Sequence, residues 1–220
     1  MSEAFHVGRG HRSIVVIACQ HPGEDGAERV ARDMAERLQQ VPLPGATIDI
    51  VPLVNGEGRL IGLTRETPSG IDLNRCWHIA PSDIRLSRLR QGLAVADFVI
   101  DIHADEHADR PYTVAPAPCP VAVQARVVAF REAFAAHLAH ATRRPRPIGA
   151  GEDDPGILVN WLAKCGVPAV MLEVPMQLAR ARHSADFQSV RHRERRLAVA
   201  AIAGLEAVLK ADGVDREAPI

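Results

Sequence analysis

An apolar, β-branched run near the start of the chain is the feature that most limits what the sequence can fold into. Residues 13–19 (SIVVIAC) carry no charge over seven positions. A run of this kind is typical of a strand buried on both faces, as in a parallel sheet. Similar runs follow at 97–103 and 169–174, and each is separated from the next by segments with helical spacing of apolar residues.

This alternation predicts an α/β fold in one domain, 1–220: a mixed, mostly parallel twisted sheet with helices on both faces. A long loop over 54–81 interrupts the pattern, and loops of that length are usually functional. The predicted strands are 13–19, 46–53, 97–103, 112–115 and 169–174, and the predicted helices are 24–40, 84–96, 121–142, 156–165 and 186–210.

Composition and charge exclude several classes of protein. The 220 residues are 47% hydrophobic and 24% charged, which is enough apolar material for one sizeable core. The net charge of -1 argues against a general nucleic-acid or membrane-surface binder. No apolar run approaches the roughly 20 residues of a membrane span, and the first residues do not resemble a signal peptide. We therefore expect a cytoplasmic protein with no nucleic-acid and no membrane partner; the oligomeric state stays open.

Ionisable side chains occur where three of the predicted strands end. His21 and Glu24 follow the first strand, His103 ends the third, and Glu173 interrupts the last. Sites in open α/β sheets collect at the carboxyl ends of strands. Two imidazoles and a carboxylate are a common set of catalytic zinc ligands, which leaves a fourth position for water. Glu173 is costly to bury unpaired, so it has either an arginine partner or a catalytic role.

Five segments, taken together, are more specific than any one of them. They are HPGE at 21–24, VPLVNGEG at 51–58, GIDLNRCW at 70–77, DIHADE at 101–106 and VPAVMLEVP at 167–175. In this order the chain resembles the zinc carboxypeptidases of the M14 family, most of all their cytosolic carboxypeptidase branch. The resemblance covers about residues 13–176. It implies the zinc carboxypeptidase-like fold and one bound Zn²⁺.

The resemblance also implies the metal ligands and their support. His21, Glu24 and His103 would bind the zinc ion. Asp72 would accept the other ring N–H of His21 and so fix its tautomer.

Further residues are implied to act on the substrate. Asn74 and Arg75 would hold its terminal carboxylate, for which the planar guanidinium fork is well suited. Arg65 would polarise the scissile carbonyl, although a solvated loop charge is an equally good interpretation. Glu173 would be the general base and acid.

The leading hypothesis is a metallocarboxypeptidase that hydrolyses the C-terminal amide bond of a peptide with a zinc-activated water. The alternative is a zinc-dependent N-acyl amino acid deacylase of the succinylglutamate desuccinylase/aspartoacylase type. A non-catalytic binding module on the same fold is a third interpretation. The partner is accordingly a peptide or an N-acyl amino acid, and its side-chain preference stays open.

Several residues depart from the family pattern. Segment 55–58 reads NGEG instead of NPDG, and Ala104 replaces the usual glycine after the third ligand. The one tyrosine of the chain, Tyr112, follows His103 closely, where relatives carry a mobile tyrosine later in the chain. The cluster Asp105-Glu106-His107 could line the pocket or bind a second metal, but a solvated loop is the simpler interpretation.

Overall fold

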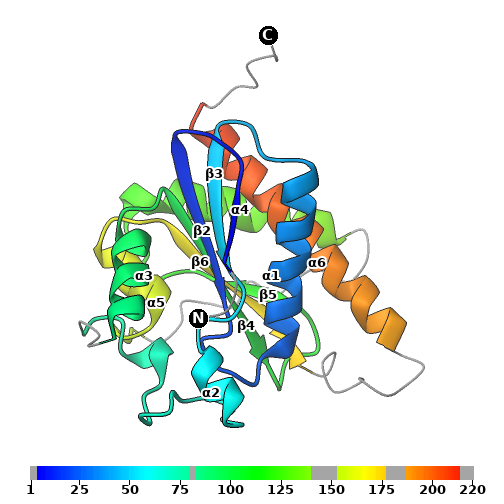
Figure 1. Cartoon of the computed structure of the whole chain (residues 1–220). Helices are drawn as coiled ribbons and strands as arrows, with labels where there is room; N and C mark the ends of the chain where they lie inside the picture. Colours follow the sequence, from blue (N-terminus) through cyan, green and yellow to red (C-terminus); the bar gives the residue numbers. More distant parts are fainter. Residues whose placement is uncertain (1–3, 80–82, 140–152, 177–186, 214–220) are drawn as a thin grey trace.

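The computed structural model describes residues 4–79, 83–139, 153–176 and 187–213 (Figure 1). Its centre is a six-stranded sheet in the order β1-β3-β2-β4-β6-β5. The four inner strands are parallel, and the two edge strands β1 and β5 run antiparallel to their neighbours. The strands are β1 (Phe5–Val7), β2 (Arg12–Ala18), β3 (Ala46–Val51), β4 (Phe98–Asp105), β5 (Tyr112–Val114) and β6 (Ala169–Pro175).

Helices cover both faces of this sheet, as Figure 1 shows. α1, α4 and α6 pack on one face, and α3 and α5 pack on the other. The mixed, mostly parallel α/β fold predicted from the sequence is thereby confirmed. The helices are α1 (Asp25–Gln40), α2 (Gly56–Leu60), α3 (Ile84–Ala94), α4 (Val121–Ala139), α5 (Leu158–Lys164) and α6 (Phe187–Ala211), with a short 3₁₀ helix at Leu73–Arg75. None of the helices in the described residues is long and apolar enough to cross a membrane.

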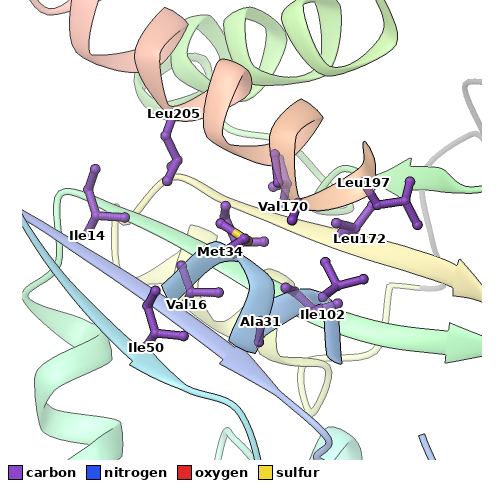
Figure 2. Close-up of a cluster of buried hydrophobic side chains, with 14 of the residues drawn as sticks. Ile14, Val16, Ala31, Met34, Ile50, Ile102, Val170, Leu172, Leu197 and Leu205 are labelled. Carbon is purple, nitrogen blue, oxygen red and sulfur yellow. The ribbon is translucent and has the colours of Figure 1, made fainter. Parts of the chain in front are cut away.

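The sheet divides the apolar interior into two cores. Because successive side chains of a strand point to opposite faces, Ile14 and Val16 of β2 enter the first core, and Val15 and Ile17 enter the second. The first core lies under α1, α4 and α6, and the second under α3 and α5. Figure 2 shows side chains of the first core, with Met34 of α1 among them. Burial on both faces explains why β2 lacks polar alternation.

The same alternation fixes which way the last strand presents its carboxylate. Val170 and Leu172 of β6 belong to the first core, whereas Met171 belongs to the second. Glu173 therefore shares the face of Met171, on the side of α3 and α5.

The structure differs from the sequence prediction in short elements. Strand β1 was not predicted; its three residues form a strand because they pair with β3, not because of their own pattern. Helix α2 lies within the predicted loop 54–81, where the Asn55 side chain caps it by accepting a hydrogen bond from the Gly58 amide (3.1 Å). Parts of the sequence prediction lie outside the described residues: 140–142 at the end of the predicted helix 121–142, 143–152 in the loop after it, and residue 186 at the start of the predicted helix 186–210.

Candidate metal centre and active site

A tight turn between β2 and α1 carries the first two candidate ligands. Cys19, directly after β2, has a φ of 54°, a left-handed conformation that is uncommon for a residue with a side chain. Its thiol donates a hydrogen bond to the carbonyl oxygen of Glu24 (3.0 Å), which closes the turn. Glu24 is the residue that precedes the first turn of α1. The turn thus places His21 and Glu24 side by side at the carboxyl end of the sheet.

Three side chains from two separate elements meet at one point. The Nδ1 atom of His21 lies 2.8 Å from Oε1 of Glu24, and Nδ1 of His103, on β4, lies 3.3 Å from the same oxygen. One ligand atom from each residue falls within 4.8 Å of the others. His21, Glu24 and His103 are 8%, 5% and 2% exposed. The spacing and burial fit a single divalent cation held by two imidazoles and one carboxylate.

Two further observations support a fit between this cluster and a metal. The Oε2 atom of Glu24 is buried and accepts no hydrogen bond of good geometry within the described part of the chain, while Nδ1 of His103 lies 3.2 Å from it. Burial raises the pKa of Glu24, but His103 and His21 lower it further, so the net shift is downward. An ionised carboxylate with an unused lone pair between two imidazole nitrogens is a donor set for a cation.

The outer ring nitrogens of both histidines contact carboxylates. Nε2 of His21 lies 3.1 Å from Oδ1 of Asp72, and Nε2 of His103 lies 3.1 Å from Oδ2 of Asp101. If each Nε2 carries the proton, each Nδ1 is left free to bind a metal. Asp72 had been implied by the family resemblance, whereas Asp101 was missed. Its signal was its place two residues before His103 in one strand, which puts both side chains on the same face.

Charge neighbours perturb the two histidines in the same direction. Burial alone would lower the pKa of His103, but Asp101 and Glu24 raise it well above its ordinary value. Burial likewise opposes protonation of His21, while hydrogen bonds to Asp72 and Glu24 raise its pKa overall. The surrounding carboxylates thus favour positive charge at the centre of the cluster, and a divalent cation there would satisfy the same carboxylates.

A chain of hydrogen bonds supports Asp101 from behind. Nε2 of Gln20 donates to Oδ2 of Asp101 (2.8 Å), and the indole N–H of Trp77 donates to Oε1 of Gln20 (2.6 Å). Gln20 is completely buried. The tryptophan that ends the GIDLNRCW segment thus acts through Gln20 on the environment of the third ligand, a role that the sequence did not indicate.

Glu173 faces the cluster from the neighbouring strand. It lies opposite His103 in the β4–β6 register, and both side chains line one cavity of about 710 Å³. Burial raises the pKa of Glu173 to about 7; His103 opposes this shift, while Glu24 adds to it. Among the described residues no arginine, and no other group, forms an ion pair or hydrogen bond with its carboxylate. The alternative interpretation, a buried salt bridge, finds no partner there.

The residues implied to bind substrate surround the same cavity. Asn74 is buried; its Oδ1 accepts the backbone N–H of Leu158 (3.0 Å), and its Nδ2 lies 3.4 Å from Nε2 of His103. Arg75 lines the cavity, and its Nε lies 3.5 Å from Asp154.

Arg65 lies at the cavity rim, with 52% of its side chain exposed. Both Nε and Nη2 contact Oδ2 of Asp72, at 2.8 and 2.7 Å. Seven of the eight residues singled out from the sequence line this one cavity, and the eighth, Asp72, is hydrogen-bonded to three of them, His21, Arg65 and the backbone of Asn74. The seven are His21, Glu24, Arg65, Asn74, Arg75, His103 and Glu173.

The second polar cluster also lines this cavity: Asp105 is the last residue of β4, and Glu106 and His107 follow it. The hydroxyl of Tyr112 donates to Oδ2 of Asp105 (2.6 Å). Burial and this hydrogen bond raise the pKa of Tyr112. Glu106 and His107 are exposed. Within the described residues, the ligand grouping at His21 is the only one close enough for a metal ion.

No family model matches this chain. An uncharacterised protein of Zymomonas mobilis is 34% identical over 118 residues, a match that covers 47% of this chain and 30% of that protein.

Solved structures give a longer match. A metallo-carboxypeptidase from Pseudomonas aeruginosa superposes with a TM-score of 0.76 at 23% identity, and one from Burkholderia cenocepacia with 0.72 at 21%; each match covers 94% of this chain and 60% of the other. A succinylglutamate desuccinylase/aspartoacylase from Rhodobacter sphaeroides gives 0.62 at 21%, over 93% of this chain and 56% of that one. The chain therefore has the metallo-carboxypeptidase fold, and it spans about 60% of the length of these solved chains.

Proposed function

We propose that this chain is a zinc-dependent amide hydrolase of the M14 type, which releases the C-terminal amino acid of a peptide. One observation carries the proposal. Glu173, without a partner among the described residues, faces the cavity that also holds the buried His21, Glu24 and His103 grouping. A half-buried carboxylate that has no partner among the described residues and lies beside a candidate metal centre is costly for folding, so a catalytic role is the best account of it.

The residues that would hold zinc are His21, Glu24 and His103. When bound, zinc supplies a water of lowered pKa and polarises the carbonyl of the scissile bond. Asp72 and Asp101 orient the two imidazoles through their Nε2 atoms. These carboxylates act by positioning, because they contact the ligands and not the reacting atoms.

Glu173 would move the proton. Its carboxylate takes a proton from the attacking water and returns it to the leaving amine. In the metal-free protein burial raises the pKa of Glu173 to about 7; His103 opposes this shift, while Glu24, Asp105 and Asp101 add to it. Bound zinc would favour the ionised form, which is the form that accepts the proton of the water.

The substrate would be oriented by its carboxylate. Arg75 offers a guanidinium that lines the cavity, and Asn74 offers its amide N–H₂ as donor, while its Oδ1 accepts the backbone N–H of Leu158 and so fixes the orientation of the amide. Arg65, fixed by Asp72, is placed to donate to the oxyanion that forms on the scissile carbonyl. If Arg65 were only a solvated charge of the loop, its two contacts with Asp72 would have no function.

A second candidate function uses the same site on an N-acyl amino acid. Two observations favour it: the fold is shared with succinylglutamate desuccinylases, and the hydroxyl of Tyr112 is engaged with Asp105. Membership of the cytosolic branch, a domain extent of 1–220 and a cytoplasmic location stay predictions from the sequence.

Metal analysis followed by two substrate panels tests the proposal. We expect one zinc per chain and release of amino acids from N-blocked dipeptides. The second candidate predicts faster turnover of N-acetyl and N-succinyl amino acids instead. Stoichiometric zinc with no turnover in either panel, or full activity of Glu173→Gln, would contradict hydrolysis at this site.

A further inference from the structure

One wall of the cavity is apolar and continuous with the protein core. Its described members Ile157, Val159 and Met171 belong to the second core, and Val114 packs against that core. Other residues of the cavity lining are charged, among them Arg75 and, at the end of β4, Asp105. The four wall residues themselves carry no charge.

The apolar wall begins next to the proposed base. Met171 and Glu173 are two residues apart on β6 and share one face of the sheet. Val114, on the edge strand β5, lies directly opposite Met171 in the antiparallel register. A substrate atom held at Glu173 therefore has the side chains of Met171 and Val114 as its neighbours along the sheet.

The other half of the wall is fixed to the carboxylate-binding segment. The backbone N–H of Leu158 donates to Oδ1 of Asn74 (3.0 Å), and the N–H of Trp77 donates to the carbonyl of Gly156 (3.2 Å). A Cβ on Gly156 would lie 2.0 Å from the carbonyl oxygen of Arg75, so only glycine permits this approach. Ile157 and Val159 are the neighbours of Leu158 in the chain. These contacts therefore hold their side chains beside Asn74 and Arg75.

Polar groups near the wall are already satisfied. Oδ1 of Asn160 accepts the N–H of Ala117 (2.8 Å), and its Nδ2 donates to the carbonyl of Asp154 (2.9 Å). The carboxylate of Asp154 lies 3.5 Å from Nε of Arg75. A charged substrate group placed against Ile157 and Met171 would lose its water without gaining a partner from these residues.

We infer that Val114, Ile157, Val159 and Met171 form the subsite for the side chain of the released amino acid, and that this subsite selects an uncharged, apolar side chain such as leucine, methionine or valine. The inference rests on the proposed function, and it holds for both substrate types, because a peptide and an N-acyl amino acid release the same product. The product carboxylate lies at Asn74 and Arg75, and the side chain extends onto the wall.

Matched substrate series test the inference. N-benzoylglycyl-X and N-acetyl-X are compared with X as leucine, arginine or glutamate. We expect kcat/KM for leucine to exceed that for arginine and for glutamate by at least about tenfold in whichever series is turned over. A preference for arginine or glutamate would overturn the inference and leave the hydrolase proposal intact.

Binding of the free amino acids keeps the two proposals separable. If neither series is turned over, the hydrolase proposal fails, and calorimetry with L-leucine, L-arginine and L-glutamate on the zinc-loaded protein still tests the subsite. Tighter binding of leucine by about tenfold supports the subsite. Equal or tighter binding of arginine or glutamate refutes it.

A charge placed in the wall should change the preference. Val114 is partly exposed on an edge strand, so Val114→Asp is expected to fold, and it should raise the arginine-to-leucine ratio by at least about tenfold. Met171→Asp is the second variant, with circular dichroism to verify folding. Val128→Asp is the control: it adds the same charge at a 39% exposed site on α4, across the sheet, and should leave the ratio unchanged. A folded Val114→Asp or Met171→Asp protein with the wild-type ratio would overturn the assignment.

Discussion

Replacing the proposed base should make the metal-free protein more stable. Glu173 is held against the second core without a partner among the described residues, and burial raises its pKa to about 7 from the ordinary 4.5. A folded pKa above the unfolded one means that the folded state resists ionisation of this group. The cost is absent below pH 4.5, grows as the pH rises to about 7 and is complete above it. Glu173→Gln removes the charge and hence this cost.

The size of the effect follows from the same two pKa values. The gap between them corresponds to about 3 kcal/mol in the free energy of unfolding. Because the carboxylate is partly exposed to a solvent-accessible cavity, we expect about 2 kcal/mol above pH 7. Bound zinc, a positive charge beside Glu173, would favour the ionised form and reduce the difference.

Urea unfolding at pH 4, 6 and 8 in the presence of a chelator measures this directly. Glu173→Gln should match wild type at pH 4 and exceed it at pH 8. The control is Glu194→Gln. Glu194 is also buried, at 0% exposure, but it accepts hydrogen bonds from Arg29 and Arg191.

Glu194→Gln removes the carboxylate from a buried ion pair and leaves its arginine partners without it. The free energy of unfolding should therefore fall by about 3 kcal/mol. Two results would show that the ionised Glu173 does not destabilise the fold. One is a Glu173→Gln protein that is less stable than wild type at pH 8; the other is a stability difference between the two proteins that does not change with pH.

Three further predictions concern the site and its supports. Glu173→Gln with zinc retained should lower kcat by a factor of about 10² to 10⁴; a loss of activity that only mirrors lost zinc would contradict the assigned role. Pro22 lies in the turn between the candidate ligands His21 and Glu24, and Nε of Arg59 donates to its carbonyl (2.9 Å), which holds this turn in place. Arg59→Gln should weaken zinc binding about 10- to 100-fold in a chelator competition assay, and unchanged affinity would refute that role. Asp83 caps α3, so Asp83→Ala should cost about 1 kcal/mol at pH 7 by urea unfolding. The hydrogen bond from Arg85 lowers the pKa of Asp83 to about 2, so the cost should persist at pH 4 and vanish as the pH falls through about 2; a cost already absent at pH 4 would argue against the cap.

Local sequence signals were sufficient for the central strands, the long helices and the first ligand pair. Strand β2 is apolar from Ile14 to Ala18 because this part is buried on both faces, and the pattern is readable without any tertiary knowledge. His21 and Glu24 come from one turn, so their proximity follows from a three-residue spacing. His103 and Glu173 could be placed near that turn because the carboxyl ends of parallel strands share one edge of the sheet.

Only the tertiary structure decided the groups that act across the fold. Gln20, which follows β2, reaches Asp101 on β4 because these two strands are neighbours in the sheet, and no local pattern encodes that adjacency. The edge strand β1 exists through its pairing with β3. The apolar wall beside Arg75 depends on close backbone contact between segments some eighty residues apart. Local periodicity reports which face of an element is buried, whereas its neighbour is set by packing of the whole chain.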